Sequence, residues 1–413
     1  MVMTLDPLAR FVAQVMAIVV VSRVIAIGTR RLGQPLVIAE MVGGILLGPS
    51  LLGRVMPEFS AALFAPDSLG ALRIASQFGL VFFMFLVGVD LDTAHLRKGN
   101  WMSVAISQSG IFTPFVLGAA LALWMYPSYG SPFTSRTTFI LFMGAAMSVT
   151  AFPVLARILI ERQLSKTRIG AIAITCAAVD DITAWCILAF IVGVARHRDT
   201  SGAVLTAVLA AGYVAVMFGV VRPAMARLAR NMADPEAMSR RWMPAVVVAM
   251  LASSWTTEVI GIHALFGGFL FGAILPRERG FAHAVARRLE DLVVVVLLPL
   301  FFALSGLHTN IDLLADRRDW MVCGVVVVVA CAGKFGGCSV AARVNGLSWR
   351  EAGVLGVLMN TRGLMELIVL NIGLEIGVLS PIVFSMMVVM ALVTTFLTAP
   401  LLRRFAPAAD GPR

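Results

Sequence analysis

Long apolar stretches separated by short polar loops dominate the pattern of the chain. Each stretch is close to the ~20 apolar residues that a helix needs to cross a bilayer. The pattern therefore predicts an all-α polytopic membrane protein with about thirteen crossing helices, of which the ninth is unusually short. The predicted helices cover residues 8–27, 36–52, 71–89, 101–125, 138–159, 169–194, 203–221, 243–259, 262–275, 292–307, 320–342, 352–376 and 382–402.

Composition and charge agree with a membrane protein. Hydrophobic residues make up 59% of the chain and charged residues 14%, a balance far from that of a soluble domain. The net charge of +10 comes mostly from basic residues in alternate short loops, which predicts an outside N-terminus and a cytoplasmic C-terminus in a cell membrane, most simply a bacterial plasma membrane. Nucleic-acid binding is not needed to explain this charge. The loop residues include Arg30, Arg31, Arg240, Arg241, Arg287, Arg288, Arg403 and Arg404.

The thirteen segments divide into two groups of six with one segment between them. The second group begins seven segments after the first, an odd number, so each of its helices crosses the membrane in the opposite direction to its counterpart. Inverted repeats of this kind are common in secondary transporters. Two interrupted helices occupy matching positions, at 148–153 in the fifth segment and at 360–363 in the twelfth. Each break alone is compatible with a tolerated kink, but paired breaks indicate a binding site. The residues predicted to line it are Thr150, Ala151, Pro153, Asn360, Thr361 and Gly363.

Two adjacent acids lie in the middle of the sixth segment, Asp180 and Asp181. Ionised side chains inside a membrane are costly and usually mark an ion or proton path. Lys334 in the eleventh segment is one of three lysines in the chain, and a buried Lys, unlike Arg, can lose its proton. Because neighbouring helical residues point ~100° apart, one acid can pair with Lys334 while the other faces a cavity.

The twelfth segment holds two further charges, Arg362 and Glu366. They are four residues apart and so lie on one face of a helix, where oppositely charged side chains pair. We interpret them as a structural ion pair beside the break.

Four stretches together resemble the monovalent cation:proton antiporter superfamily, in the branch that contains Kef-type transporters and plant cation/H exchangers. The resemblance covers nearly the whole chain. The stretches are GQPLVIAEMVGGILLGPS at 33–50, SVTAFPVLAR at 148–157, AVDDITAW at 178–185 and NTRGLMELIVLN at 360–371.

The resemblance implies a homodimer in which each protomer has a mobile core subdomain, 101–194 and 320–402, and a dimerisation subdomain, 8–89 and 243–307, joined by a linking helix at 203–221. It also implies that Asp181 alternately binds a cation or protons while Asp180 pairs with Lys334. A cytosolic regulatory domain, which Kef-like relatives carry, is not expected within these 413 residues.

The predicted function is therefore exchange of Na+ or K+ for protons, with the transported cation bound transiently at Asp181. No enzyme activity and no cofactor are expected. Two alternatives remain open at this stage, a sodium-coupled organic-anion symporter of the same fold and a channel-like cation pathway. An intramembrane aspartyl protease is disfavoured because its two acids must face each other, and consecutive residues of one helix do not.

Overall fold

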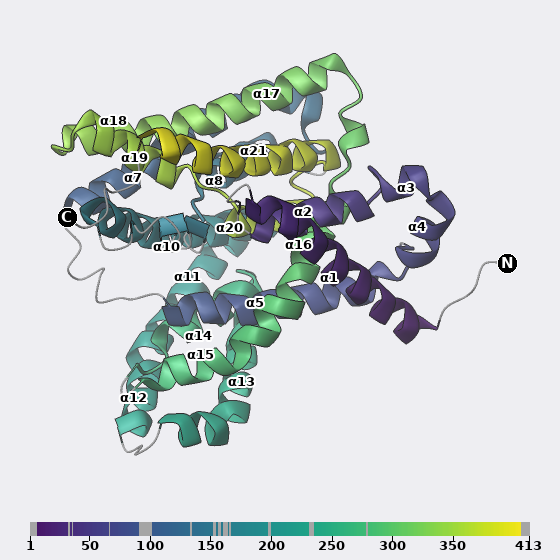
Figure 1. Cartoon of the computed structure of the whole chain (residues 1–413). Coiled ribbons are helices and arrows are strands. Elements are labelled where there is room, and N and C mark those ends of the chain that lie inside the picture. The colour runs from purple at the N-terminus through teal and green to yellow at the C-terminus, as the bar shows by residue number, and fades with distance from the viewer. Residues whose placement is uncertain are drawn as a thin grey trace, which may run out of the picture. The chain divides into compact units, whose positions relative to one another are not determined.

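A computed structural model gives the arrangement of most of the chain (Figure 1). It describes residues 6–31, 34, 36–65, 67–90, 101–132, 134–151, 154–155, 158–159, 164, 167–196, 200–230, 235–277 and 280–405. The described part is helical, without a strand. Ten of its helices are long and apolar enough to cross a membrane, so the prediction of an all-α polytopic membrane fold is confirmed.

The helices follow one another along the whole chain. The first group is α1 (Pro7–Arg31), α2 (Leu36–Leu47), α3 (Leu52–Val55), α4 (Pro57–Leu63), α5 (Leu69–Asp90), α7 (Trp101–Tyr129), α8 (Arg136–Ser148), α10 (Arg168–Arg196), α11 (Thr200–Val216), η1 (Met217–Val221) and α12 (Arg222–Arg230). The second group is α13 (Pro235–Ile260), α14 (Ala264–Ile274), α15 (Phe281–Leu292), η3 (Val293–Leu297), α16 (Leu298–His308), η4 (Ile311–Leu313), α17 (Arg317–Cys331), η5 (Ala332–Gly336), α18 (Gly337–Val344), α19 (Trp349–Met359), α20 (Leu364–Glu375) and α21 (Pro381–Phe405).

Three of the predicted crossings are not among the ten helices that are long and apolar enough to cross a membrane. The ninth corresponds to α14, which has 11 residues. In the fifth, α8 ends at Ser148 and the chain is non-helical through Ala151. In the twelfth, α19 ends at Met359 and α20 begins at Leu364. The breaks thus begin where proline, glycine and polar residues interrupt the apolar pattern.

The predicted start of the tenth helix, at residue 292, was wrong. The helix begins at Phe281 and runs through α15, η3 and α16 without interruption. Four charged residues in the last turns of α15 concealed it, because a hydropathy criterion excludes a helix with one polar face. They are Arg287, Arg288, Glu290 and Asp291.

The chain forms two compact units, which are described separately. The first unit comprises Met1–Val19, Ala62–Asp92 and Ala189–Leu304, and the second comprises Val20–Ala61, Thr93–Leu188 and Ser305–Arg413.

The first unit is built around direct backbone contact between α5 and α14. A Cβ atom added to Gly272 would lie 2.1 Å from the Phe85 carbonyl oxygen, and one added to Gly88 would lie 2.1 Å from that of Phe269. Small residues allow membrane helices to approach this closely. The rings of Phe85 and Phe271 stack beside the contact, with centroids 6.1 Å apart.

In the second unit, α7 packs against the η5–α18 segment through glycines of that segment. A Cβ atom added to Gly333 would lie 2.8 Å from the Pro114 Cα atom, and one added to Gly337 would lie 2.9 Å from the Thr113 Cβ atom. A buried apolar cluster that includes Leu155 and Leu355 fills the interior. This packing positions the polar residues described below.

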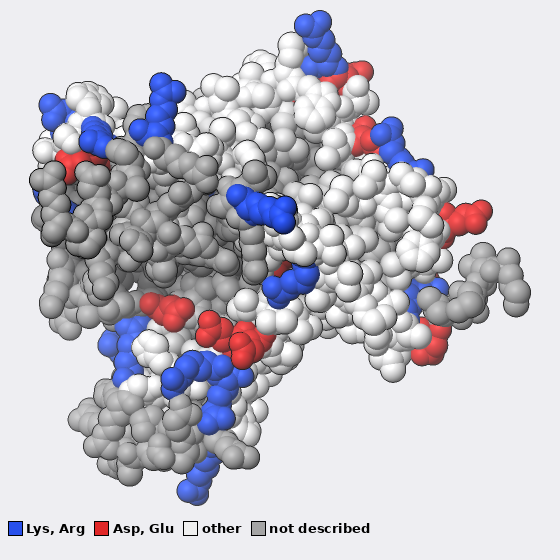
Figure 2. All heavy atoms as spheres, viewed as in Figure 1, with Lys and Arg blue, Asp and Glu red and all other residues white. Residues whose placement is uncertain are grey.

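On the face shown in Figure 2, most of the described surface belongs to residues other than Lys, Arg, Asp and Glu, which are drawn in white. On α1, exposed apolar side chains recur every three or four residues, as expected for a helix face in contact with lipid. They are Leu8, Val12, Met16, Val20, Val24 and Ile27.

Candidate cation and proton site

Asp180 on α10 is fully buried and lies at the centre of a polar cluster in the second unit. Its Oδ2 atom accepts hydrogen bonds from Lys334 Nζ at 2.8 Å and Thr150 Oγ1 at 2.7 Å. Its Oδ1 atom accepts one from the Ser107 hydroxyl. Donors from three different segments therefore compensate the cost of burying this carboxylate.

Lys334 is also fully buried and forms an ion pair with Asp180. It lies in η5, a π-helical turn between α17 and α18. Such turns occur mostly as single insertions in α-helices and often at functional sites. Nζ also donates to the Ser148 carbonyl at 2.5 Å, so one ammonium group joins the acid to the last residue of α8.

Arg362 also donates hydrogen bonds to the C-terminal end of α8. Its Nη2 atom donates to the Met147 carbonyl at 2.7 Å and Nη1 to the Ala146 carbonyl at 3.3 Å. Nη1 also pairs with Glu366 Oε1 at 3.0 Å, with both side chains fully buried. The last carbonyls of a helix have no partner within it and carry partial negative charge. The last three of α8 thus accept hydrogen bonds from the two buried cations.

The two helix breaks meet at this cluster. The Ala151 N–H donates to the Thr361 carbonyl at 3.2 Å, and Thr150 Oγ1 lies 3.3 Å from the Met359 carbonyl. Gly363 packs closely beside this contact, because a Cβ atom there would lie 3.0 Å from the Val154 Cγ2 atom, tighter than an ordinary contact. Pro153, predicted to line the site, lies outside the described residues.

Further buried oxygen atoms belong to residues at or beside the helix breaks. Asp181, adjacent to Asp180 on α10, is 2% exposed. Within the described part of the chain, Asn360 Oδ1 and Thr361 Oγ1 are buried and accept no hydrogen bond. Buried polar atoms are normally satisfied, so these oxygens can accept a donor or a cation. Among the residues that the structure covers, no three or more His, Cys, Asp or Glu side chains are arranged so that they could hold a metal ion.

The structure brings together Asp180, Lys334 and Thr150, and it joins Ala151 to Thr361. Ser107 was missed by the sequence analysis. A signal for it exists, since Ser103 and Ser107 are four residues apart and form a small polar stripe on the apolar helix α7. Both are buried, and the Ser103 carbonyl accepts a hydrogen bond from the Cys176 thiol of α10 at 3.2 Å.

Crossed helix breaks with buried charges, in an all-helical membrane fold, are typical of secondary transporters. The family model for the sodium/hydrogen exchanger, transmembrane, matches residues 16–405. The chain belongs to this family, and the resemblance inferred from the four sequence stretches is confirmed.

Relatives include transporters from bacteria, plants and yeast. The chain is 42% identical to the Na+/H+ antiporter NhaS4 of Synechocystis sp., over 98% of this chain and 99% of that protein. It is 41% identical to cation/H+ antiporter 17 of Arabidopsis thaliana over 94% of this chain, and 32% identical to K+/H+ antiporter 1 of Saccharomyces cerevisiae over 99%. These two alignments cover 47% and 48% of the plant and yeast proteins, so the chain spans about half of their length.

A solved structure has the same fold. The sodium proton antiporter MjNhaP1 from Methanocaldococcus jannaschii superposes with a TM-score of 0.68, over 97% of this chain and 98% of that one. The sequence identity is 14%, so this similarity concerns the fold alone.

Proposed function

We propose that the protein is a secondary active antiporter that exchanges Na+ or K+ for protons at Asp180 and Asp181. The observation that carries the proposal is the fully buried ion pair between Asp180 and Lys334 where two helix breaks cross. An ion pair at this depth is costly and marks an ion path. The relatives named as Na+/H+ and K+/H+ antiporters support the same function.

In this mechanism the two acids have different roles. Both Asp180 oxygens are engaged, by Lys334, Thr150 and Ser107, so we assign exchange to Asp181. A carboxylate that binds an alkali cation must be ionised, so a bound proton and a bound cation exclude each other. The competition at Asp181 couples the two fluxes.

Asn360 and Thr361 are proposed to complete the cation site. Oxygen ligands suit alkali cations, and a membrane-embedded site must replace the hydration shell of the ion. The buried Oδ1 of Asn360 and Oγ1 of Thr361 accept no hydrogen bond from any described residue, and they belong to the segment that crosses beside Thr150 and Ala151.

Alternating access is proposed to arise from movement of the core subdomain, 101–194 and 320–402, against the dimerisation subdomain of a homodimer. Inverted-repeat transporters commonly move one bundle against another around a central site. The N-terminus would then lie outside the cell and the C-terminus in the cytoplasm, in accord with the distribution of Lys and Arg.

Replacing Asp181 with Asn tests the assignment. The purified variant is reconstituted in liposomes containing a pH-sensitive dye, and Na+, K+ or Li+ is added to a preformed proton gradient. We expect Asp181→Asn to abolish cation-driven dequenching while its elution from a size-exclusion column stays unchanged. Asp291→Asn, the same change at an exposed residue, is the matched control and should exchange normally.

Three outcomes would contradict the proposal. Normal exchange by Asp181→Asn would remove Asp181 from the mechanism. Cation flux without proton movement would indicate a channel. Proton-independent uptake of an organic anion with Na+ would indicate a symporter.

Lys334→Gln tests whether the lysine participates in proton coupling. Lys334 is the ion-pair partner of the buried Asp180, so removing its charge should change the pH at which exchange is half-maximal. The measurement is the rate of dequenching between pH 6 and 9. A profile that overlays that of the parent protein would leave Lys334 with a structural role only.

A further inference from the structure

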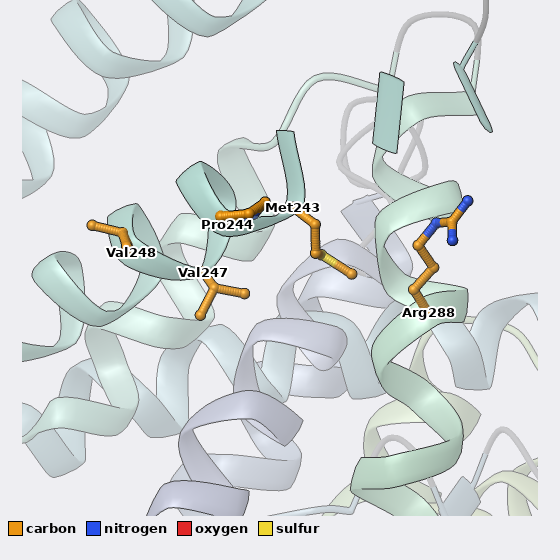
Figure 3. Close-up of a pocket in the computed structure, with 5 residues that line it drawn as sticks. All are labelled: Met243, Pro244, Val247, Val248 and Arg288. Carbon is orange, nitrogen blue, oxygen red and sulfur yellow. The ribbon is translucent and has the colours of Figure 1, made fainter. Parts of the chain in front are cut away.

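The first unit contains a groove that is lined by none of the residues of the candidate cation and proton site. It has a volume of about 530 Å³ and is lined by Met243, Pro244, Val247 and Val248 of α13 and by Arg288 of α15. Figure 3 shows Met243 extending from α13 toward α15, the helix that carries Arg288. The groove is therefore apolar along one wall, with one cation on the other.

The groove lies near the end of its membrane span. The span that contains α13 begins at Arg241, which puts Met243 about 3 Å and Val248 about 10 Å further along the helix axis. The continuous helix that contains α15 runs from Phe281 to His308, or about 42 Å. This exceeds the ~30 Å hydrocarbon core, so its polar first part, with Arg288, extends to the interface.

We propose that this groove binds an anionic phospholipid, with an acyl chain along α13 and the phosphate at Arg288. An apolar wall matches an acyl chain, and a guanidinium binds phosphate oxygens in bidentate geometry. Lipid is the occupant because the groove opens on a membrane-spanning surface at headgroup depth. Arg241 starts the α13 span, and basic residues beside a span attract anionic lipid.

The neighbouring charges narrow the class of lipid. Glu290 and Asp291 follow Arg288 within one turn of α15. Their carboxylates repel a headgroup with several negative charges, whereas a single phosphodiester can be accepted by Arg288. The expected ligand is therefore a singly charged lipid such as phosphatidylglycerol rather than a polyphosphorylated one.

The test is the thermal unfolding midpoint of the purified protein in detergent micelles with added lipid. We expect phosphatidylglycerol to raise it by about 3–5 °C at saturation, and phosphatidylcholine or inorganic phosphate to leave it unchanged. Arg288→Gln should require about tenfold more phosphatidylglycerol for half of the shift. Val247→Trp, which fills the apolar wall, should weaken the effect similarly.

Arg287→Gln is the matched control, because it removes the same charge from the adjacent, exposed position of α15. It should keep the parent response. The proposal is overturned if Arg287→Gln and Arg288→Gln weaken the response equally, or if phosphatidylcholine gives the same shift as phosphatidylglycerol. An equal shift with inorganic phosphate would also overturn it, since the acyl chain would then contribute nothing.

Discussion

Two contacts, one in each unit of the molecule, hold membrane helices together by different means. In the first unit, α5 and α14 touch backbone to backbone at Gly88 and Gly272. In the second unit, α8, α10 and η5 are joined through Asp180 and Lys334, a charged pair with 0% exposure on both side chains.

The two kinds of contact suit different purposes, since one holds helices in fixed positions and the other can bind ions. Apolar helices gain little from burying one another in lipid, so close packing of small residues holds a scaffold. Buried charges cost free energy unless they are paired, but they can exchange partners when a proton or a cation arrives. The charged crossing is therefore suited to a transport cycle and the glycine contact to a fixed frame.

The largest expected effect comes from breaking the charged pair on one side. Lys334→Met leaves the fully buried Asp180 without its cation and the Ser148 carbonyl without its donor. Removing one partner of a buried pair costs about 3–5 kcal/mol. The measurement is the unfolding midpoint in detergent, which should fall well below that of the parent protein.

The double variant Asp180→Asn with Lys334→Met is the control for charge. It removes both charges, so it should be more stable than Lys334→Met alone by roughly 2 kcal/mol. If the changes in the free energy of unfolding caused by the two single substitutions simply add in the double variant, the two groups are not coupled. The contrast between the charged pair and the glycine contact would then fail.

An intermediate effect is expected at the glycine contact. Gly272→Ala places a methyl group 2.1 Å from the Phe85 carbonyl oxygen, so α5 and α14 must separate. Overpacking of this kind costs about 1–3 kcal/mol. Gly212→Ala on α11, where a Cβ atom meets nothing within 4 Å, is the control. Equal unfolding midpoints for the two variants would show that α5 and α14 can separate at little cost in stability.

The smallest effect is expected at the exposed start of α19 in the second unit. Ser348 and Glu351 form a capping box, and the Ser348 N–H and hydroxyl donate to Glu351 Oε2 at 2.9 and 2.8 Å. These two bonds lower the pKa of Glu351 below 4.5. Ser348→Ala should cost about 1 kcal/mol.

The pH dependence of this cap follows from the lowered pKa. The folded state binds the Glu351 proton more weakly than the unfolded state, so its stabilisation is complete above pH ~4.5 and is lost as the pH falls through the folded-state pKa. Glu351→Gln should remove this part of the acid sensitivity. Identical unfolding profiles of variant and parent between pH 3 and 7 would contradict it.

Much of the fold was accessible from the sequence because lipid imposes a simple criterion of length and polarity on each crossing. That criterion failed at α15, where charged residues on one face hid a helix that begins at Phe281. It also could not show that residues 332–336 form a π-helical turn, since nothing in their hydropathy distinguishes i→i+5 from i→i+4 hydrogen bonding.

The site was predictable in its charges but not in its backbone contacts. Asp180, Lys334 and the Arg362–Glu366 pair stand out as charges in apolar segments. The acceptors of Arg362 on α8, the Ala146 and Met147 carbonyls, carry no sequence signal because every residue has a carbonyl. Ser107 was overlooked because serines are common in membrane helices.

The contacts at the end of α8 restrict how the transporter can move. Arg362 and Lys334 join this helix end to the twelfth and eleventh segments through hydrogen bonds to its last three carbonyls. Because these contacts link α8 to both segments, we expect the three segments to move as one body during transport, with the opening that admits ions along the outer boundary of that body.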